Sequence, residues 1–235
     1  MDTATIATNP HASQPRTHAA PSRETLAVFG ATRGVGLRLV AQALAAGHRV
    51  RALVRDPRRF ALTHPRLEVL GGDALDPAAV LGTLEGADAV ICALGAPALS
   101  RSKVRSEGTT RIVRAMEETG QRRLICVSVL GARESREGLP FFLRYVIFPL
   151  YLRRAVAEHE RQERVLEESG LDWTAVRPPT LTDGPPTGAY AFGFEPPEMG
   201  RLTLDISRAD VAHFMLEELG ADAHVGRTVG ISYRK

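Results

Sequence analysis

The chain has 235 residues, of which 44% are hydrophobic, 24% charged and 6% aromatic, a composition typical of a soluble globular protein. Thirty Lys and Arg residues against 27 Asp and Glu residues give a formal net charge of +3, and the charges are scattered. This pattern offers no extended basic face and argues against a dedicated nucleic-acid-binding protein. The apolar run from Leu139 to Leu152 contains Arg144 and Pro149 and is shorter than the roughly 18 to 20 residues of a membrane-spanning helix.

The cysteines and the N-terminal residues bear on the location of the protein. Cys92 and Cys126 lie inside apolar runs, so we expect no disulfide framework and a reducing compartment, the cytoplasm. Residues 1–24 are rich in Ala, Thr, Ser, Pro and His without an apolar core, which excludes a secretory signal peptide and predicts a disordered extension. A transit peptide is an alternative, because this segment carries Arg16, Arg23 and few acids, although it has no clear amphipathic pattern.

Short apolar runs alternate with stretches of helical periodicity from Leu26 onward, which is typical of βαβ units around a parallel sheet. The predicted strands are Leu26–Phe29, Arg49–Val54, Leu67–Leu70, Ala87–Ala93, Leu124–Ser128 and Trp173–Val176. The predicted helices are Val35–Ala46, Pro77–Leu84, Lys103–Thr119, Arg153–Ser169 and Arg208–Leu219, the last capped by Ser207.

This order of elements predicts an α/β fold, a doubly wound parallel sheet of the Rossmann type in three α/β/α layers. We expect a single domain at residues 25–235, with substrate-side insertions at residues 133–152 and 180–203. Because Gly and Pro are frequent from Asp183 to Gly200, we expect no regular element in that stretch.

A glycine-rich turn lies between the first predicted strand and the first predicted helix. Its backbone N–H groups and the N-terminus of the helix can approach a pyrophosphate, and the turn opens a roughly 30-residue βαβ unit that closes at Val54. These features favour a dinucleotide-binding turn over a tight structural turn without a ligand. Its candidate cofactor-binding residues are Gly30, Thr32, Arg33, Gly34, Val35 and Gly36.

The end of the second predicted strand bears on the choice between NAD and NADP. NAD-binding proteins place an acidic side chain there against the ribose 2′-hydroxyl, whereas this chain has Arg55. Together with Arg33 and with Arg58 or Arg59, its guanidinium can pair with a 2′-phosphate, so NADP(H) is favoured over NAD(H). The alternative is that Asp56 binds the ribose and the arginines are solvated.

Two further strand ends border the predicted cofactor groove. Asp73 can accept a hydrogen bond from the adenine amino group while the backbone of Ala74 holds the ring edge. Alternatively, Asp73 only caps the helix that starts at Pro77. The residues after the fourth strand leave room for the ribose and nicotinamide, or form only a tight turn; they are Ala93, Leu94 and Gly95.

Several segments outside the glycine turn match one known pattern. They are Val28–Thr32, Leu53–Asp56, Ser106–Gly108, Ser169–Leu171, Arg177–Pro179, Thr187–Tyr190 and His213–Leu216. From Leu26 to about Tyr233, the chain therefore resembles an atypical short-chain dehydrogenase/reductase with an NAD(P)-binding, NmrA-like fold. The resemblance is nearest to the biliverdin reductase B/flavin reductase group.

The resemblance implies roles for residues beyond the glycine turn. Arg59 would join Arg55 at the 2′-phosphate, Ser128 would lie near the nicotinamide and His159 near the active site. It also implies cofactor contacts at Cys126, Pro178 and Thr180. This chain departs from the group's pattern in three places, because Arg33 replaces a glycine, Thr180 replaces a histidine, and residues 134–154 are longer and more apolar.

The Tyr-x-x-x-Lys pair, in which a lysine lowers the pKa of the catalytic tyrosine in ordinary short-chain dehydrogenases, is missing. Catalysis must then rest on positioning of the cofactor, which suits hydride transfer to a flavin, a quinone or a similar conjugated acceptor. We expect an NADPH-dependent oxidoreductase in which Ser128 polarises the acceptor or binds the nicotinamide, and His159 donates a proton. The alternatives are an ordinary strand-end serine and a water-facing histidine. His159 has no second histidine at metal-ligand spacing, so no metal site is predicted.

Two other functions fit the same residues. A non-catalytic NmrA-like protein would bind NADP(H) and contact a partner through residues 141–152, and a tailoring ketoreductase or epimerase would need Tyr145 or Tyr151 as proton donor. Residues 139–152 themselves could form a lid over a small planar apolar substrate, a buried core helix, a homodimer contact or a membrane-surface helix.

Overall fold

The computed structural model describes residues 23–97, 99–194 and 196–235. Its strands are β1 (Thr25–Phe29), β2 (Arg49–Val54), β3 (Leu67–Gly71), β4 (Ala89–Cys92), β5 (Arg123–Val127), β6 (Asp172–Arg177), β7 (Thr180–Thr182), β8 (Ala191–Phe192), β9 (Asp205–Ser207) and β10 (Arg227–Ser232). Its α-helices are α1 (Gly34–Ala45), α2 (Pro77–Leu84), α3 (Val104–Thr119), α4 (Arg153–Glu168) and α5 (Arg208–Glu217). Shorter helical segments are η1 (Pro57–Arg59), η2 (Arg133–Gly138), the π-helical η3 (Leu143–Leu152), η4 (Pro196–Arg201) and η5 (Asp222–His224). The predicted extension at residues 1–24 lies almost wholly outside the described residues.

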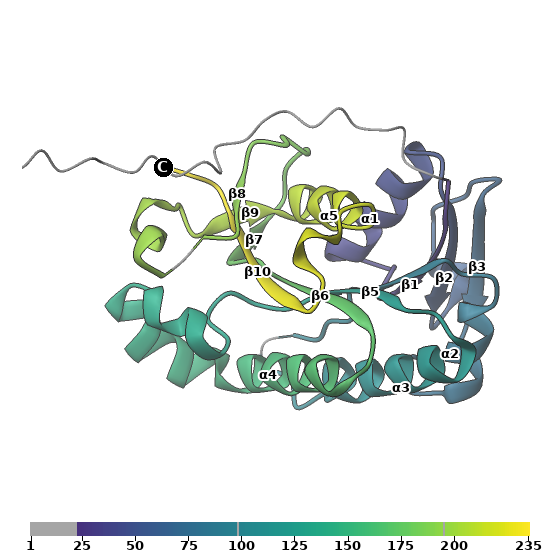
Figure 1. The fold of residues 1–235 in the computed structure, drawn as a ribbon, viewed down its shortest axis with the longest axis horizontal. Coiled ribbons are helices and arrows are strands. Elements are labelled where there is room, and N and C mark those ends of the chain that lie inside the picture. The colour runs from purple at the N-terminus through teal and green to yellow at the C-terminus, as the bar shows by residue number, and fades with distance from the viewer. Residues whose placement is uncertain (1–22, 98, 195) are drawn as a thin grey trace, which may run out of the picture.

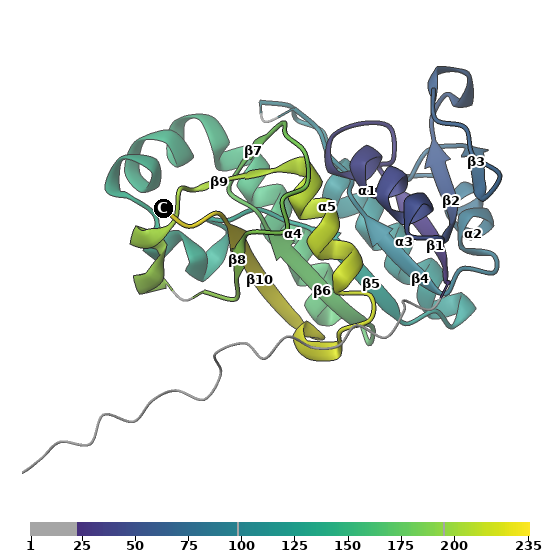
Figure 2. The ribbon, with the colours of Figure 1, turned by 90° about the horizontal axis from the view of Figure 1, so that it is seen from above.

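Eight strands form one sheet in the order β3-β2-β1-β4-β5-β6-β10-β8, in which every pairing is parallel except that of β10 with β8. Helices α1 and α5 cover one face, and α2, α3 and α4 lie side by side on the other (Figure 1). The view from above shows the same layering, with α5 and α1 in front of the sheet (Figure 2). The three-layer, doubly wound fold expected from the sequence is therefore confirmed.

The apolar strands are buried because both faces of the sheet are covered. In β1, Leu26 and Val28 pack on the side of α1 and α5, whereas Ala27 and Phe29 pack on the side of α2, α3 and α4. This alternation follows from the two-residue period of a strand, and it explains why the central strands read as continuous apolar runs. The carboxyl ends of the parallel strands share one edge of the sheet, where ligands of such folds bind.

The C-terminal third differs most from the expectation. The stretch from Asp183 to Gly200 was expected to be irregular, but it contains β8 and most of η4. The strand β10 carries no strong apolar run at its start, and it is placed by pairing with β6. The two-stranded sheet of β7 and β9 is likewise built by segments that are distant in the sequence. In the described part of the chain, no helix is both long and apolar enough to cross a membrane.

Candidate functional site

The turn between β1 and α1 needs glycine because the backbone passes very close to its neighbours. A Cβ on Gly30, which has φ +87°, would lie 2.3 Å from the Ala93 carbonyl oxygen at the end of β4. A Cβ on Gly36 would lie 2.2 Å from the Gly30 carbonyl oxygen. Both distances are far below a van der Waals contact. These two glycines therefore allow α1 to start directly above the gap between β1 and β4, the point where the strand order reverses.

The N-terminus of α1 is suited to an anion. Arg33 occupies the N-cap position without a side-chain capping hydrogen bond, and the first turn of the helix has no acidic residue. A Cβ built on Gly34, at φ +61°, meets no atom within 4 Å, so the backbone here borders open space. Unsatisfied N–H groups at a helix N-terminus attract phosphate oxygens. The residues of this turn thus fit the pyrophosphate of a dinucleotide.

Exposed arginines follow β2, where the second ribose of a dinucleotide would lie. Arg55 and Arg59 are exposed, and in the residues that the structure describes neither has a carboxylate within ion-pair distance. Asp56, the alternative ribose ligand, instead caps η1, accepting from the Arg58 backbone N–H at 3.2 Å and lying 3.4 Å from Arg58 Nε. The carboxylate is therefore engaged locally, whereas two guanidinium groups remain available for a phosphate.

The turn after β3 is closed by Asp73. Its Oδ1 accepts a hydrogen bond from the Leu75 N–H at 2.9 Å, while the buried Ala74 lies against α3. The N-cap of α2 is Asp76, which accepts from the Ala78 N–H at 3.0 Å. The alternative that Asp73 caps this helix is therefore wrong. Asp73 shapes the turn at the carboxyl edge, and among the described residues no hydrogen bond to its second carboxylate oxygen is found.

The segment after β4 lies against α3. A Cβ on Gly108 would come within 2.6 Å of Leu94 Cδ1, so only glycine at this position lets the segment and the helix approach so closely. Leu94 is half-buried and Gly95 exposed, whereas Ala93 donates its N–H to the Phe29 carbonyl oxygen at 2.8 Å. The three residues predicted to face the ribose and nicotinamide thus lie directly beside the glycine turn.

Ser128 follows β5 at the same edge and belongs to a buried ionic network. Its hydroxyl donates to Glu163 Oε1 at 2.6 Å, and Arg177 binds both oxygens of that carboxylate at 2.8 Å. Ser128 is 3% exposed and Glu163 fully buried. Burial alone would lower the pKa of Arg177, but its bonds to Glu163 and Glu134 raise it overall. With its proton engaged, Ser128 offers a ligand its oxygen lone pairs, not its hydroxyl hydrogen.

His159 lies on the buried face of α4, so the alternative of a water-facing histidine is wrong. Burial, aided by the positive charge of Arg105, lowers its pKa to about 3, and the imidazole is neutral at physiological pH. Its Nδ1 lies 3.2 Å from the Gln162 side-chain oxygen, which favours the tautomer that carries the proton on Nδ1. In this arrangement His159 is a poor proton donor through Nε2, unlike the role expected from the sequence.

The three remaining residues that were predicted to contact the cofactor lie in different surroundings. The Cys126 side chain is fully buried beside Cys92, its register partner on β4, so it does not reach a ligand at the sheet edge. Pro178 is buried and accepts from the Leu130 N–H through its carbonyl oxygen at 2.8 Å. Thr180 is exposed at the start of β7. Of these three, Thr180 alone presents its side chain to solvent near the strand ends.

Glu163 and Arg177 are members of the site that no local sequence pattern marked as such. Glu163 belongs to a polar-looking stretch of α4, and Arg177 ends an apolar strand before two prolines. One usable signal was that spacing places His159, Gln162 and Glu163 on one helical face with Val156 and Leu166, which is the buried face. Gln162 on this face also donates to Thr109 Oγ1 at 3.0 Å.

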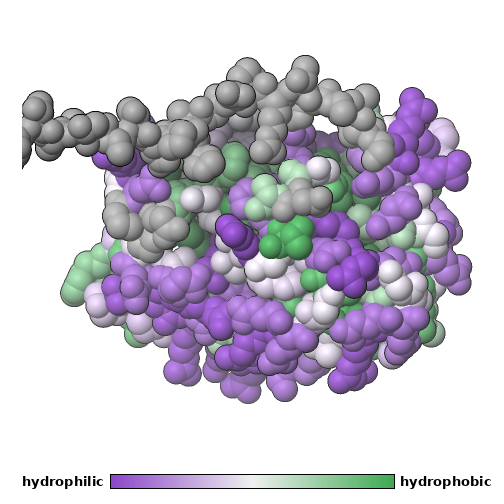
Figure 3. Space-filling view, in the orientation of Figure 1, coloured by the Kyte–Doolittle hydropathy of each residue, from purple (hydrophilic) through white to green (hydrophobic). Residues whose placement is uncertain are grey.

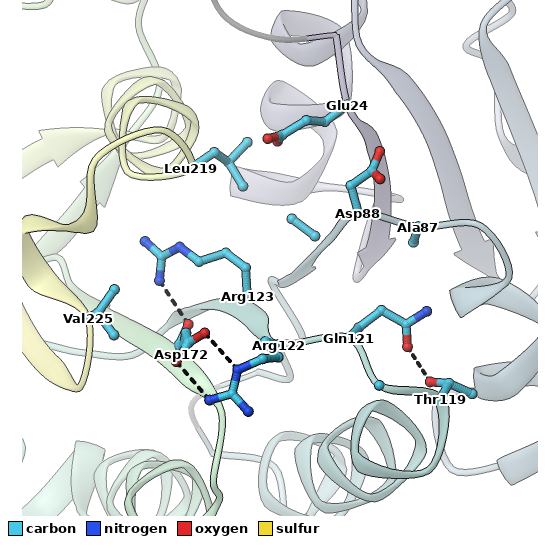
Figure 4. Close-up of a pocket in the computed structure, with 12 residues that line it drawn as sticks. Glu24, Ala87, Asp88, Thr119, Gln121, Arg122, Arg123, Asp172, Leu219 and Val225 are labelled. Carbon is cyan, nitrogen blue, oxygen red and sulfur yellow. Dashed lines mark hydrogen bonds and ion pairs between the residues drawn. The ribbon is translucent and has the colours of Figure 1, made fainter.

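An open hollow of about 790 Å³ lies at the opposite, amino-terminal edge of the sheet (Figure 4). Its charged side chains bind one another or the backbone, since Arg122 pairs with Asp172 at 3.0 Å and Asp88 accepts from the Thr25 N–H at 2.8 Å. Arg123 reaches the Asp172 carbonyl oxygen at 3.0 Å. These contacts join the starts of neighbouring strands, and we assign the hollow a structural role.

Comparison with known proteins adds to this geometry. A family model described as NAD(P)H-binding matches residues 30–222. An uncharacterised chloroplastic protein of Arabidopsis thaliana is 31% identical over 201 residues, which are 82% of this chain and 70% of that protein. The 3-diazoavenalumate denitrifying reductase of a Streptomyces species is 34% identical over 213 residues, which are 80% of this chain and 66% of that reductase.

Solved structures share the fold. ChuY of Escherichia coli, described as an anaerobillin reductase, is 24% identical with a TM-score of 0.72, covering 88% of this chain and 96% of its own. A short-chain dehydrogenase/reductase of Veillonella parvula, solved in complex with NADP, is 21% identical with a TM-score of 0.76. The match covers 90% of this chain and 95% of that one. At these identities, the likeness concerns the fold alone.

Proposed function

The chain belongs to the NAD(P)H-binding family, as an atypical short-chain dehydrogenase/reductase, and on that basis we propose that it is an NADPH-dependent reductase. Its acceptor is a flavin, a quinone or a similar planar conjugated molecule, and it acts in a reducing compartment, the cytoplasm. The observation that carries the proposal is the N-terminus of α1 behind the glycine turn, which has no side-chain cap, together with the exposed Arg55 and Arg59 that follow the neighbouring strand β2. An anion site and two available guanidinium groups suit a dinucleotide with a 2′-phosphate.

Each part of the carboxyl edge has a role in this proposal. The backbone N–H groups of Gly34, Val35 and Gly36 bind the pyrophosphate, with Thr32 and Arg33 beside it. Arg55 and Arg59 bind the 2′-phosphate, and Asp73 and Ala74 hold the adenine. Residues 93–95 border the ribose and nicotinamide, and Pro178 and Thr180 follow β6 at the same edge of the sheet.

The reduced nicotinamide supplies a hydride, and the acceptor takes up that hydride together with a proton. The Glu163–Arg177 pair keeps the Ser128 hydroxyl turned inward, so the Ser128 oxygen is left to accept a hydrogen bond from an N–H of the nicotinamide amide or of a flavin acceptor. Because His159 is neutral, the proton comes from solvent. Because the Tyr-x-x-x-Lys motif is missing, the rate of hydride transfer depends on how the cofactor and the acceptor are positioned and not on an acid–base pair.

The relatives support reduction over the other candidate functions. The Streptomyces relative, at 34% identity, and a relative from Aspergillus terreus, at 26% identity, are both described as reductases. A ketoreductase or epimerase would need Tyr145 or Tyr151 as proton donor, but these side chains are 55% and 58% exposed on the outer side of η3. A non-catalytic NADP(H)-binding protein is the alternative that the experiment must separate.

The test is NADPH consumption by the purified protein with FMN and then with a small quinone, with NADH as the parallel control. We expect turnover that prefers NADPH. Ser128→Ala should lower kcat by a larger factor than it weakens NADPH binding, because the other proposed cofactor contacts remain. Ser169→Ala, at the far end of α4, serves as the matched control. Tight NADPH binding without turnover on either acceptor would contradict the reductase and favour the non-catalytic protein.

A further inference from the structure

Large apolar side chains gather on the outer side of the segment that precedes α4. The exposed fractions of this outer face are 75% for Phe141, 61% for Phe142, 55% for Tyr145, 68% for Leu150 and 58% for Tyr151. Figure 3 shows hydrophobic atoms at the left-hand edge of the molecule, the end where Figure 1 places the helical segment before α4. The alternative of a buried core helix is therefore wrong for this segment.

The inner side of the same segment already accounts for its place in the fold. Leu139, Leu143 and Leu152 pack in a cluster with Leu130 and Val156. The outer face contributes nothing to that cluster and exposes its aromatic rings to water. Contiguous exposed apolar surface of this kind marks an interaction site in a soluble protein. The rings are also preordered, since those of Phe141 and Tyr145 lie 4.6 Å apart between centroids.

The charged side chains within the segment itself are all arginines, and the exposed Glu137 directly precedes it. Residues 138–157 contain Arg144, Arg153 and Arg154 and no Asp or Glu. The Arg144 guanidinium lies over the Tyr145 ring, 5.2 Å from its centroid, and Arg153 and Arg154 are exposed where η3 continues into α4. Aromatic and aliphatic side chains bordered by arginines are typical of helices that lie in the interface of an anionic bilayer.

We propose that the outer face of η3 binds the surface of an anionic lipid membrane. The apolar run is too short to cross the roughly 30 Å hydrocarbon core, so the segment lies on the membrane and does not span it. A second copy of the chain fits less well, because a twofold contact would place the arginines of both copies together. The proposal is independent of the identity of the acceptor.

Co-sedimentation of the full chain with phospholipid vesicles tests this proposal. We expect binding to phosphatidylcholine vesicles that contain about 30% phosphatidylglycerol, and much weaker binding to phosphatidylcholine alone. Raising the salt from about 0.1 M to about 1 M should weaken binding, because the Debye length falls from about 10 Å to about 3 Å.

Two variants separate the apolar and the charged contributions. The Phe141→Ser/Phe142→Ser variant should lose most binding while unfolding at the same temperature, since both side chains are exposed. The Arg153→Gln/Arg154→Gln variant should lose about fivefold in partitioning per arginine. Its matched control is Arg111→Gln/Arg114→Gln, which removes the same charge from exposed positions of α3 and should retain binding.

Three results would overturn the proposal. The first is the absence of wild-type binding to anionic vesicles. The second is an equal loss of binding in the α3 control, which would reduce the effect to net charge. The third is a concentration-dependent dimer in light scattering that the Phe141→Ser/Phe142→Ser variant abolishes, which would assign the outer face to a second copy of the chain.

Discussion

The buried pair of Glu163 and Arg177 allows a stability prediction of definite size. Arg177 is 3% exposed and Glu163 fully buried, and two hydrogen bonds of 2.8 Å join them. In Arg177→Met, Glu163 keeps only the Ser128 hydroxyl among these partners, whereas the exposed Glu134 is rehydrated. Breaking one partner of a buried ion pair costs about 3–5 kcal/mol, because an uncompensated charge stays buried.

Urea denaturation followed by circular dichroism measures this change. For a chain of this length, the predicted loss corresponds to a Tm lowered by roughly 6–20 °C. The double variant Glu163→Leu/Arg177→Met should recover most of the stability, since it removes both charges and leaves apolar side chains of similar size. The control Arg122→Gln breaks an exposed pair and should barely move the midpoint. A loss below about 1 kcal/mol in Arg177→Met, or a double variant less stable than the single one, would refute the reasoning.

Three further predictions concern the cofactor edge and pH. Arg55→Glu should weaken NADPH binding by about tenfold or more and leave NADH binding nearly unchanged, because only NADPH carries the 2′-phosphate. Fluorescence titration measures both affinities. An unaltered ratio of NADPH to NADH affinity would remove Arg55 from the site. Gly30→Ala should unfold at a lower temperature, because its Cβ would meet Ala93. Gly34→Ala should still fold, with a free energy of unfolding lower by about 1–2 kcal/mol, and should lose cofactor affinity because its Cβ enters the open space of the turn. Equal stability and equal cofactor affinity of the two variants would contradict this. The folded-state pKa of His159, about 3, lies below the unfolded value of 6.5, so the stability that neutral His159 contributes is present above pH 6.5 and is lost progressively as pH falls toward 3. In urea titrations, the free energy of unfolding should therefore fall by about 2 kcal/mol less in His159→Gln than in the wild type when the pH is lowered from about 7 to about 5. An equal fall in both proteins would show that His159 does not titrate in this way.

The amino-acid sequence alone determined the layers of the fold and the position of the cofactor turn. Both are local signals, since strand and helix periods are written in short windows and the glycines cluster directly between the first strand and the first helix. The close approach of Gly36 to Gly30 is also local, whereas the contact of Gly30 with Ala93 comes from the pairing of β1 with β4. The position of Arg55 at the end of β2 could be predicted for the same reason, because the strand end and the arginine are neighbours in the chain.

Tertiary structure alone decided which polar side chains are buried together. Ser128 and Glu163 are 35 residues apart, and Glu163 and Arg177 are 14 apart, so their contact depends on how α4 packs against β5 and β6. The same packing buries His159 and lowers its pKa, a change that no local pattern reveals because burial belongs to the assembled layers. For the apolar segment, the sequence left four roles open, and the packing of its inner leucines decided which side chains face water. Periodicity specifies an element and its apolar side, whereas the environment of each polar group is specified by contacts between elements that lie far apart in the chain.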